Sequence, residues 1–493
     1  MPSNRQVWDY ESVTPASSAT RRRRESGDGD DLSREEAGGP SGGELTGDSD
    51  EVRTSAPEEL SPVVAARGAR AGAGVVLRRG HGLTFAALLL FTTILYLRPG
   101  ELYPSPLTAS IAFVVGIFTL VVFSVSQLGL EGTLTARPRE VNLLLLFCLA
   151  GFLSIPLALD PRLAWDTFSG VFIRCVIICV VMVNAVRTTA RLRGLMWAAL
   201  VTAFCLSFVA VNDYRLGKLT VEGYRVGGVG AGMFGNPNDL ALFLVTVAPI
   251  AAALFFGTRS VVGKMVYALA TLLLTAAVVV TYSRGGFLGL AAAYIIMAWK
   301  IGRRNKVGVM LLVVVCGVVL LALAPGNYML RLLSIFNPNL DSMGSSDMRQ
   351  QILWRSVWTA IVNPLNGIGM GNFPLVSFRD LVSHNSYTQV AAEMGIPALV
   401  VYTLFMLTPL KGLRKIERAT FEARKRSRYF HLSVGLQASI AGYMVSSFFG
   451  SVAYLWYVYY IVGYAVCLRR IYDGEEASRA EAALARPTGE DVD

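Results

Sequence analysis

The chain has 493 residues, of which 53% are hydrophobic and only 16% are charged. Soluble proteins carry about a quarter charged residues, so this composition excludes an ordinary soluble domain. Apolar runs of about 20 residues recur along the sequence, and each is long enough to cross a bilayer as a helix. Because a helix satisfies its own backbone hydrogen bonds inside the hydrocarbon, we predict an all-α polytopic membrane protein.

Residues 1–80 differ in composition from the rest of the chain. They are rich in Gly, Ser, Asp, Glu and Arg, with RRRR at 21–24 and GDGDD at 27–31. Such a segment cannot bury enough apolar surface to offset the entropy lost on ordering, so we predict a disordered cytoplasmic tail. The region near Met1 lacks the apolar stretch of a secretory signal peptide.

Residues 81–470 are predicted to form the transmembrane domain, with about 12 spans. The predicted spans cover residues 83–98, 106–128, 141–158, 165–186, 195–211, 237–257, 263–282, 285–300, 307–324, 386–410, 430–450 and 453–468. A long extracytoplasmic loop, residues 325–384, precedes the tenth span, and residues 471–493 form a cytoplasmic C-terminal tail.

Lysine and arginine concentrate in alternate connections between the spans. The densest run is KGLRKIERATFEARKRSR at 411–428, and the Arg-rich tail before the first span falls on the same side. Basic connections mark the cytoplasmic side of a membrane protein. We therefore expect both termini to be cytoplasmic. The net charge of +10 follows from this pattern, and nucleic acid is not an expected partner.

Two motifs on the outer side predict helix starts. In GNPN at 235–238, Asn236 can cap a helix that has Pro237 as its first residue, with Asn238 in the first turn. In SRGG at 283–286, Ser283 is the predicted cap and Arg284 lies in the first turn. Each helix runs inward, so its positive dipole end faces the outer surface, where phosphate-like anions bind readily.

A third motif, SHNSY at 383–387, starts another inward helix, with Ser383 or Asn385 as the cap. It contains His384, which is one of only three histidines in the chain. Tyr387 follows three residues later, and we expect it on the same helix face as His384, where it can orient the imidazole or a substrate.

Each motif also has a simpler interpretation. GNPN alone is a turn and a cap, and an arginine at a membrane edge often reaches the interface without any other role. The glycines of SRGG can serve only to let two helices pack closely. A lone histidine is more often a capping or interfacial residue than a catalyst. The combination of the three motifs on one side is what favours a functional site.

Two further segments carry alternatives. Arg174 lies well inside a predicted span, where a charge is costly and is usually functional, so it can reach a buried phosphate or a buried partner. Residues 348–362, MRQQILWRSVWTAIV, place Ile352, Leu353, Val357, Trp358 and Ile361 at helical spacing. This spacing predicts either an amphipathic helix on the outer membrane surface or a helix packed on the spans.

The motifs together resemble a known family. YRVGGVGAGMFGNPNDLA at 224–241, TYSRGGFLG at 281–289 and SHNSYTQVAAEMGIPA at 383–398 are similar to segments of the bacterial O-antigen ligase and O-antigen polymerase family. DMRQQILWRSVWTAIVNPLNGIGMGNF at 347–373 is similar to the family segment before its histidine. The resemblance covers most of residues 83–470.

The resemblance implies a glycosyltransferase of the GT-C type at the outer face of the cytoplasmic membrane. It would transfer a glycan from undecaprenyl diphosphate to an acceptor hydroxyl. In ligases the acceptor is the lipid A–core of lipopolysaccharide, in polymerases another lipid-linked glycan, and in related oligosaccharyltransferases a protein. The family's key residues map to Arg225, Arg284 and His384. The layout of about 12 spans with one long outer loop favours the ligase.

The expected mechanism needs no cofactor. Arg225 and Arg284 would stabilise the leaving diphosphate, and His384 would accept the proton of the acceptor hydroxyl in an inverting displacement. Helix dipoles and these arginines should disfavour a charged imidazole. Further substrate-binding candidates are Asn236, Asn238, Ser283, Arg349, Asn385, Tyr387 and Arg174. The outer connections show no DxD or paired-carboxylate motif, so we predict transfer without a metal ion. The main alternative from another class is a transporter of lipid-linked glycans.

Overall fold

The computed structural model describes residues 80–303 except 220, 222 and 229–231, the positions 307, 308, 311 and 317, and residues 345–424 and 427–484. Within these residues the regular secondary structure is helical, and one isolated antiparallel bridge joins Val221 to Arg225. The tail before residue 80, most of the predicted span 307–324 and the first part of the long loop lie outside the described residues.

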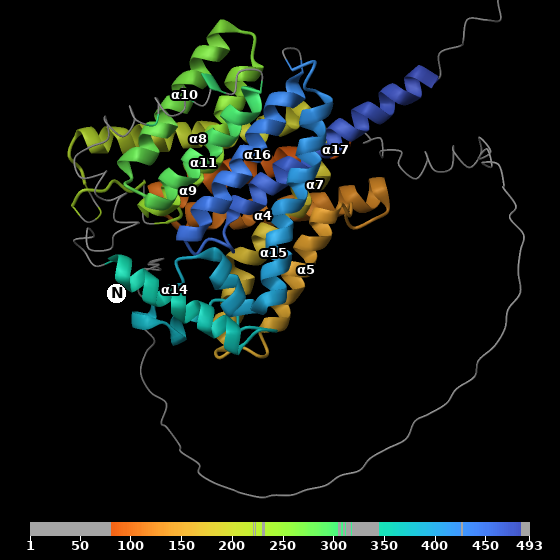
Figure 1. Cartoon of the computed structure of the whole chain (residues 1–493). Coiled ribbons are helices and arrows are strands. Elements are labelled where there is room, and N and C mark those ends of the chain that lie inside the picture. The colour runs from red at the N-terminus through yellow and green to blue at the C-terminus, as the bar shows by residue number, and fades with distance from the viewer. Residues whose placement is uncertain are drawn as a thin grey trace, which may run out of the picture. The chain divides into compact units, whose positions relative to one another are not determined.

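The helices follow one another closely along the chain (Figure 1). The α-helices are α2 (Gly82–Leu97), α3 (Pro99–Leu102), α4 (Pro106–Glu131), α5 (Arg139–Ser154), α6 (Pro161–Thr167), α7 (Ile173–Ala185), α8 (Thr189–Arg215), α9 (Pro237–Gly257), α10 (Val261–Val280), α11 (Arg284–Ile301), α14 (Ser345–Val362), α15 (Ser386–Ala419), α16 (Arg428–Ser446) and α17 (Trp456–Leu484). A π-helical turn, η1 (Phe168–Phe172), joins α6 to α7, and short 3₁₀ turns are η3 (Phe373–Val376), η4 (Phe378–Asp380) and η5 (Ser447–Phe449).

Eight helices of the described residues are long and apolar enough to cross a membrane. They confirm the prediction of a polytopic helical membrane protein. Helices α5, α11 and α17 coincide with the predicted spans 141–158, 285–300 and 453–468 but are not among these eight. The number of about 12 spans therefore remains a prediction.

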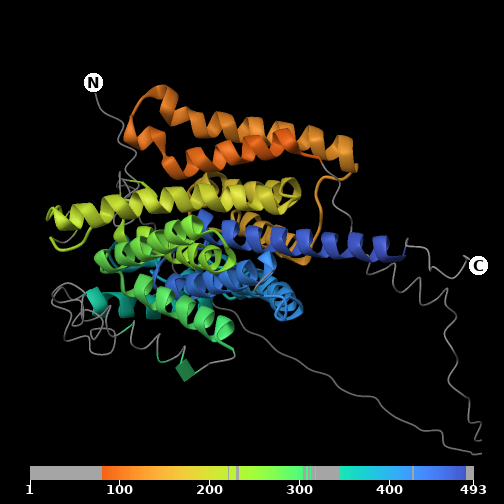
Figure 2. The ribbon, with the colours of Figure 1, turned by 90° about the horizontal axis from the view of Figure 1, so that it is seen from above.

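The centre of the bundle is α9, which packs against α10, α11 and α16. Its most apolar window is 83% buried, whereas that of α4 is 11% buried, so α9 is an interior helix and α4 faces outward. Helices α2 and α4 pack together at one edge of the bundle (Figure 2). Close packing at the centre needs glycine, because a Cβ on Gly289 of α11 would lie 2.6 Å from the carbonyl oxygen of Gly442 in α16.

Helix α15 is broken near its start. Gly395 adopts φ 88° and ψ 170°, a conformation that favours glycine, and Pro397 follows. The loop after α14 bonds to the backbone at this break: the Ile368 and Gly369 N–H groups donate to the carbonyls of Ala392 and Glu393 at 2.9 Å. Irregular backbone at membrane depth is stable where protein supplies such partners.

Helix α14 is held by this contact and shows two different faces. Ile352 is fully buried and belongs to a small core with Ala391 and Ala392 of α15. The opposite face carries Trp354 and Trp358, which are 66% and 60% exposed. The packing alternative for residues 348–362 is therefore confirmed, and the apolar exposed face remains consistent with a membrane surface.

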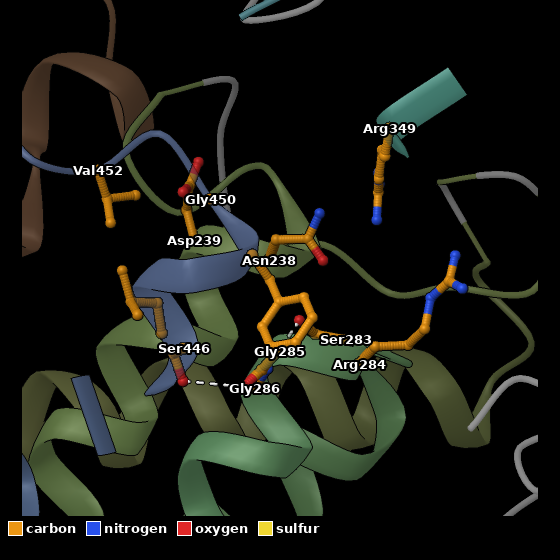
Figure 3. Close-up of a pocket in the computed structure, with 12 residues that line it drawn as sticks. Asn238, Asp239, Ser283, Arg284, Gly285, Gly286, Arg349, Ser446, Gly450 and Val452 are labelled. Atoms are coloured by element: carbon orange, nitrogen blue, oxygen red, sulfur yellow. Dashed lines mark hydrogen bonds between the residues drawn. The ribbon is translucent and has the colours of Figure 1, made fainter. Parts of the chain in front are cut away.

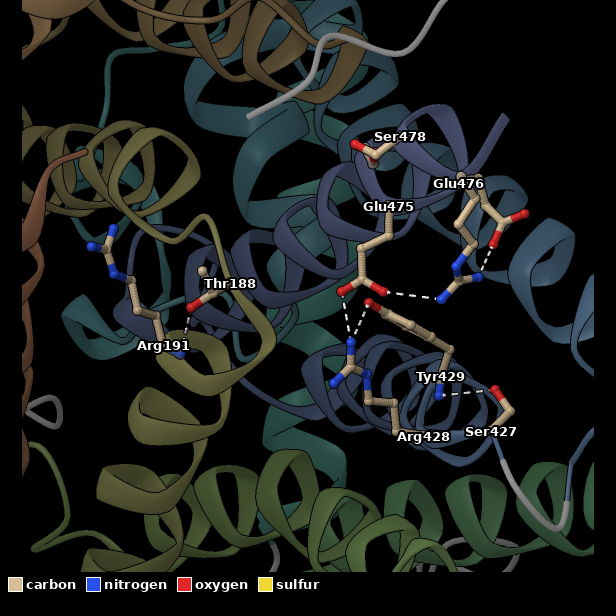
Figure 4. Close-up of polar contacts among 10 residues, drawn as sticks. Thr188, Arg191, Ser427, Arg428, Tyr429, Glu475, Glu476 and Ser478 are labelled. Carbon is tan, nitrogen blue, oxygen red and sulfur yellow. Dashed lines mark hydrogen bonds and ion pairs between the residues drawn. The ribbon is translucent and has the colours of Figure 1, made fainter. Parts of the chain in front are cut away.

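Buried carboxylates join helix ends at the end of the bundle away from the starts of α9, α11 and α15. Glu417 of α15 is 1% exposed and accepts from Lys300 at 2.6 Å and from Arg303, both at the end of the α11 segment. Glu140 of α5 accepts from Arg469 of α17 at 2.8 Å. At the surface, Arg428 at the start of α16 donates to Glu475 of α17 at 2.7 Å (Figure 4).

Candidate active site

An open recess lies where α9 and α11 begin and α16 ends (Figure 3). It is lined by Asn238, Asp239 and Leu242 of α9, by Ser283, Arg284, Gly285 and Gly286 at the start of α11, by Arg349 of α14, and by Ser446, Phe449, Gly450 and Val452 at and after the end of α16. Four of the predicted site residues, Asn238, Ser283, Arg284 and Arg349, thus share one recess although they are far apart in the sequence.

The start of α9 is built as its sequence predicts. Asn236 is the cap, and its side-chain oxygen accepts from the N–H of Asn238 at 2.8 Å, with Pro237 as the first helical residue. The side-chain oxygen of Asn238 accepts from Arg225 at 2.7 Å. Arg225 also donates to the carbonyl of Thr281 at 3.0 Å and is 3% exposed. Arg225 therefore joins the start of α9 to the turn before α11, beside the recess rather than in its lining.

The start of α11 places Arg284 at the recess. Ser283 caps the helix by accepting from the N–H of Gly286 at 3.2 Å, as predicted. Gly286 also allows contact with α9, because a Cβ there would lie 2.6 Å from the Cβ of Ala241. The preceding residue, Tyr282, has φ 53°, a strained conformation for a non-glycine residue. The two glycines thus serve packing, as the simpler interpretation held, and the same turn presents Arg284.

The start of α15 is tied to the same region by Ser386. Its hydroxyl donates to the carbonyl of Gly450 at 2.7 Å and accepts from the N–H of Val452 at 2.9 Å. Asn385 is the cap and accepts from the N–H groups of Tyr387 and Thr388. Its amide nitrogen is buried and donates to no partner among the described residues. A buried donor without a partner is costly, which favours a ligand group at this position.

His384 precedes α15 and adopts φ 52°. His384 does not line the recess. Arg349 lines the recess, and its positive charge acts on His384. Burial lowers the pKa of His384 to about 4, and the neighbouring positive charge of Arg349 acts in the same direction. The imidazole is therefore neutral at pH 7. The predicted direction of the pKa shift was right. Its main cause is burial, and the arginine that contributes is Arg349 rather than Arg225 or Arg284.

The prediction that Tyr387 shares a helix face with His384 is wrong. The helix begins at Ser386, so His384 lies outside it and helical spacing does not apply. The Tyr387 hydroxyl donates to the carbonyl of Met444 in α16 at 2.8 Å. Tyr387 therefore fastens α15 to α16.

Arg174 lies away from the recess. It is in α7, within the apolar stretch Pro161–Ala185, as its sequence position predicts. Its side chain is exposed on the bundle surface, and its guanidinium lies 5.9 Å from the ring centroid of Phe113 in α4. The structure does not bring it together with the other predicted site residues.

Two acidic residues, one in the recess lining and one in the core, were missed by sequence reasoning. Asp239 follows GNPN directly and lines the recess. Glu393 is 2% exposed, and it accepts from the Tyr454 hydroxyl at 2.8 Å and from the N–H of Phe373 at 3.4 Å. Asp239 could have been found from its position directly after GNPN. The sequence gives no signal for Glu393, because its hydrogen-bond partners come from distant segments.

One region of the chain matches a known protein family. Residues 269–403 match the model of the O-antigen ligase family, a region that includes Arg284, Arg349 and His384 but not Arg225. No curated protein matches the chain. The match supports the O-antigen ligase family for this region, and together with the apolar helices it indicates a bacterial membrane protein.

Proposed function

We propose that this protein transfers a glycan from undecaprenyl diphosphate to an acceptor hydroxyl at the outer face of the cytoplasmic membrane. The observation that carries the proposal is the recess itself, in which Arg284 and Arg349 meet the first turns of two helices. Guanidinium groups and helix N-termini both favour phosphate oxygens. The family match favours a ligase, with lipid A–core as acceptor.

In the proposed mechanism, the acceptor oxygen attacks the anomeric carbon while the bond from that carbon to the diphosphate oxygen breaks. His384 takes the proton of the acceptor hydroxyl, which its neutral state permits. The diphosphate leaves as an anion, and Arg284 and Arg349 stabilise the charge that develops on it. One displacement inverts the anomeric configuration. Arg225 acts in part by holding Asn238 at the recess.

The test is glycan transfer by purified protein in lipid vesicles, with lipid-linked glycan and lipid A–core from the source strain. We expect Arg284→Ala and His384→Ala to lower transfer by about 100-fold to 1,000-fold, the usual cost of removing such a group. Arg225→Ala should also lower transfer. Transfer should persist in excess EDTA, since the proposed chemistry uses arginine.

The matched control is Arg428→Ala, because Arg428 is an arginine at the other end of the bundle, paired with Glu475 at the surface. It should transfer like the wild type. Wild-type rates in all three site variants would refute the assignment of the site. A deletion strain that accumulates single lipid-linked repeat units, instead of long unattached glycan, would show a polymerase.

A further inference from the structure

Asp239 occupies the end of the recess away from its arginines. Its neighbour Asn238 turns toward Arg225, whereas Asp239 lies beside Gly450 on the side opposite to Arg284 and Arg349 (Figure 3). The recess therefore has two chemically different ends, one cationic and one with a carboxylate.

The carboxylate of Asp239 differs from the other enclosed carboxylates of the bundle. Glu140 and Glu417 each meet an arginine or lysine, and Glu393 accepts from the Tyr454 hydroxyl. Asp239 is partly buried and, in the part of the chain that the structure describes, accepts no hydrogen bond and forms no ion pair. Withdrawing a carboxylate from water without a partner is unfavourable, so its position in the recess calls for a ligand group that donates hydrogen bonds.

The chemistry of the ligand follows from the charge. A carboxylate repels a diphosphate, so the anionic part of a donor belongs with Arg284 and Arg349 at the other end. The described residues contain no group of three or more His, Cys, Asp or Glu side chains that could hold a metal ion beside Asp239. Neutral hydroxyl groups remain, and a carboxylate accepts strong hydrogen bonds from them.

We propose that Asp239 binds hydroxyl groups of the sugar that is attached to the diphosphate, and that it thereby selects the donor. This inference rests on the proposed function. A site built to hydrogen-bond a hydroxyl discriminates strongly against a ligand that lacks it, because the buried polar group is then left without a partner. The diphosphate would lie at the arginines and the first sugar at Asp239.

The experiment measures binding, so it does not depend on knowing the acceptor. The probes are undecaprenyl diphosphate without a sugar and undecaprenyl diphosphate carrying glucose, galactose or N-acetylglucosamine. Dissociation constants are measured for the full-length protein in nanodiscs. We expect the wild type to bind at least one sugar-bearing lipid about tenfold more tightly than the sugar-free lipid, the effect of one charge-assisted hydrogen bond.

Asp239→Ala should abolish this preference and should not weaken the binding of the sugar-free lipid. Asp239→Asn should keep part of it, because an amide oxygen still accepts hydrogen bonds. Asp213→Ala is the matched control, since Asp213 of α8 faces Lys218 at 3.8 Å outside the recess, and it should keep the full preference. Arg284→Ala should weaken the binding of all the lipids alike.

The outcomes separate the two proposals. A sugar preference that survives in Asp239→Ala would refute the role of Asp239 and leave the proposed function standing. An equal loss of affinity for all lipids in Asp239→Ala would refute it as well, because that result indicates a structural role. Failure of the wild type to bind any of the four lipids would refute the proposed function and this inference with it.

Discussion

The two ends of the helical bundle use the same residue types in different ways. At one end, Glu417 and Glu140 are almost fully buried and meet the cations of neighbouring helices directly. At the other end, Arg284 and Arg349 line a recess together with Asp239, and this carboxylate forms no ion pair with a described residue. Ion pairs fasten helices at the first end, and the carboxylate of Asp239 faces a recess with room for a polar ligand at the second.

This difference teaches how to interpret a charge in such a chain. A charged group that is buried at a helix end is stable when an opposite charge meets it. Asp239 meets no cation among the described residues, so we expect a bound molecule to satisfy it. Substitutions at the first end should therefore change stability, and substitutions at the second end should change binding and transfer.

The largest expected effect is on stability, in Glu417→Ala. The substitution leaves Lys300 and Arg303 without their shared carboxylate, and Gln437 loses its acceptor at 2.9 Å. Breaking a buried ion pair typically costs about 3–5 kcal/mol. Thermal unfolding in detergent should show a large fall in Tm, while transfer per folded molecule stays near the wild-type value. A Glu417→Ala variant that keeps the wild-type Tm but loses transfer would contradict the assignment of Glu417 to stability.

A smaller effect should show whether an arginine at each end of the bundle acts through its charge alone or also through the shape of its guanidinium group. Arg284→Lys keeps the charge but loses the planar fork that fits phosphate oxygens, so transfer should fall by about tenfold or more. Arg303→Lys at the other end keeps the pairing with Glu417 and should leave both Tm and transfer little changed. Equal transfer by Arg284→Lys and wild type would mean that Arg284 acts only as a point charge.

The smallest expected change is a shift of the pH profile. With a pKa of about 4, the neutral form of His384 persists well below pH 6.5, so kcat/KM should fall only as the pH approaches 4. The lowered pKa also means that the contribution of His384 to stability is present above pH 6.5 and is lost as the pH falls toward 4. Arg349→Gln removes one cause of the lowering and should move the acidic limb to higher pH. An acidic limb near pH 6.5 in both proteins would exclude His384 as the base.

Local chemistry made much of the helical framework predictable. Pro237 after Asn236, Ser283 before Arg284 and Asn385 before the tenth predicted span act as helix starts because capping depends on neighbours within three residues. The break at Gly395 was not predicted, because the partners of the backbone beside it come from the loop after α14, 24 residues earlier in the sequence.

The sequence by itself determined that this chain is a polytopic helical membrane protein whose motifs resemble those of the O-antigen ligase family, since hydropathy, caps and short motifs are local properties. It also determined that Arg284 stands at a helix start. Only the tertiary structure decided that Arg284, Arg349 and Asp239 share one recess, that Arg225 bonds to Asn238 beside it, and that Arg174 faces outward. The physical reason is that a recess forms where distant helices meet, and the packing of small residues such as Gly286 against Ala241 sets how closely they approach.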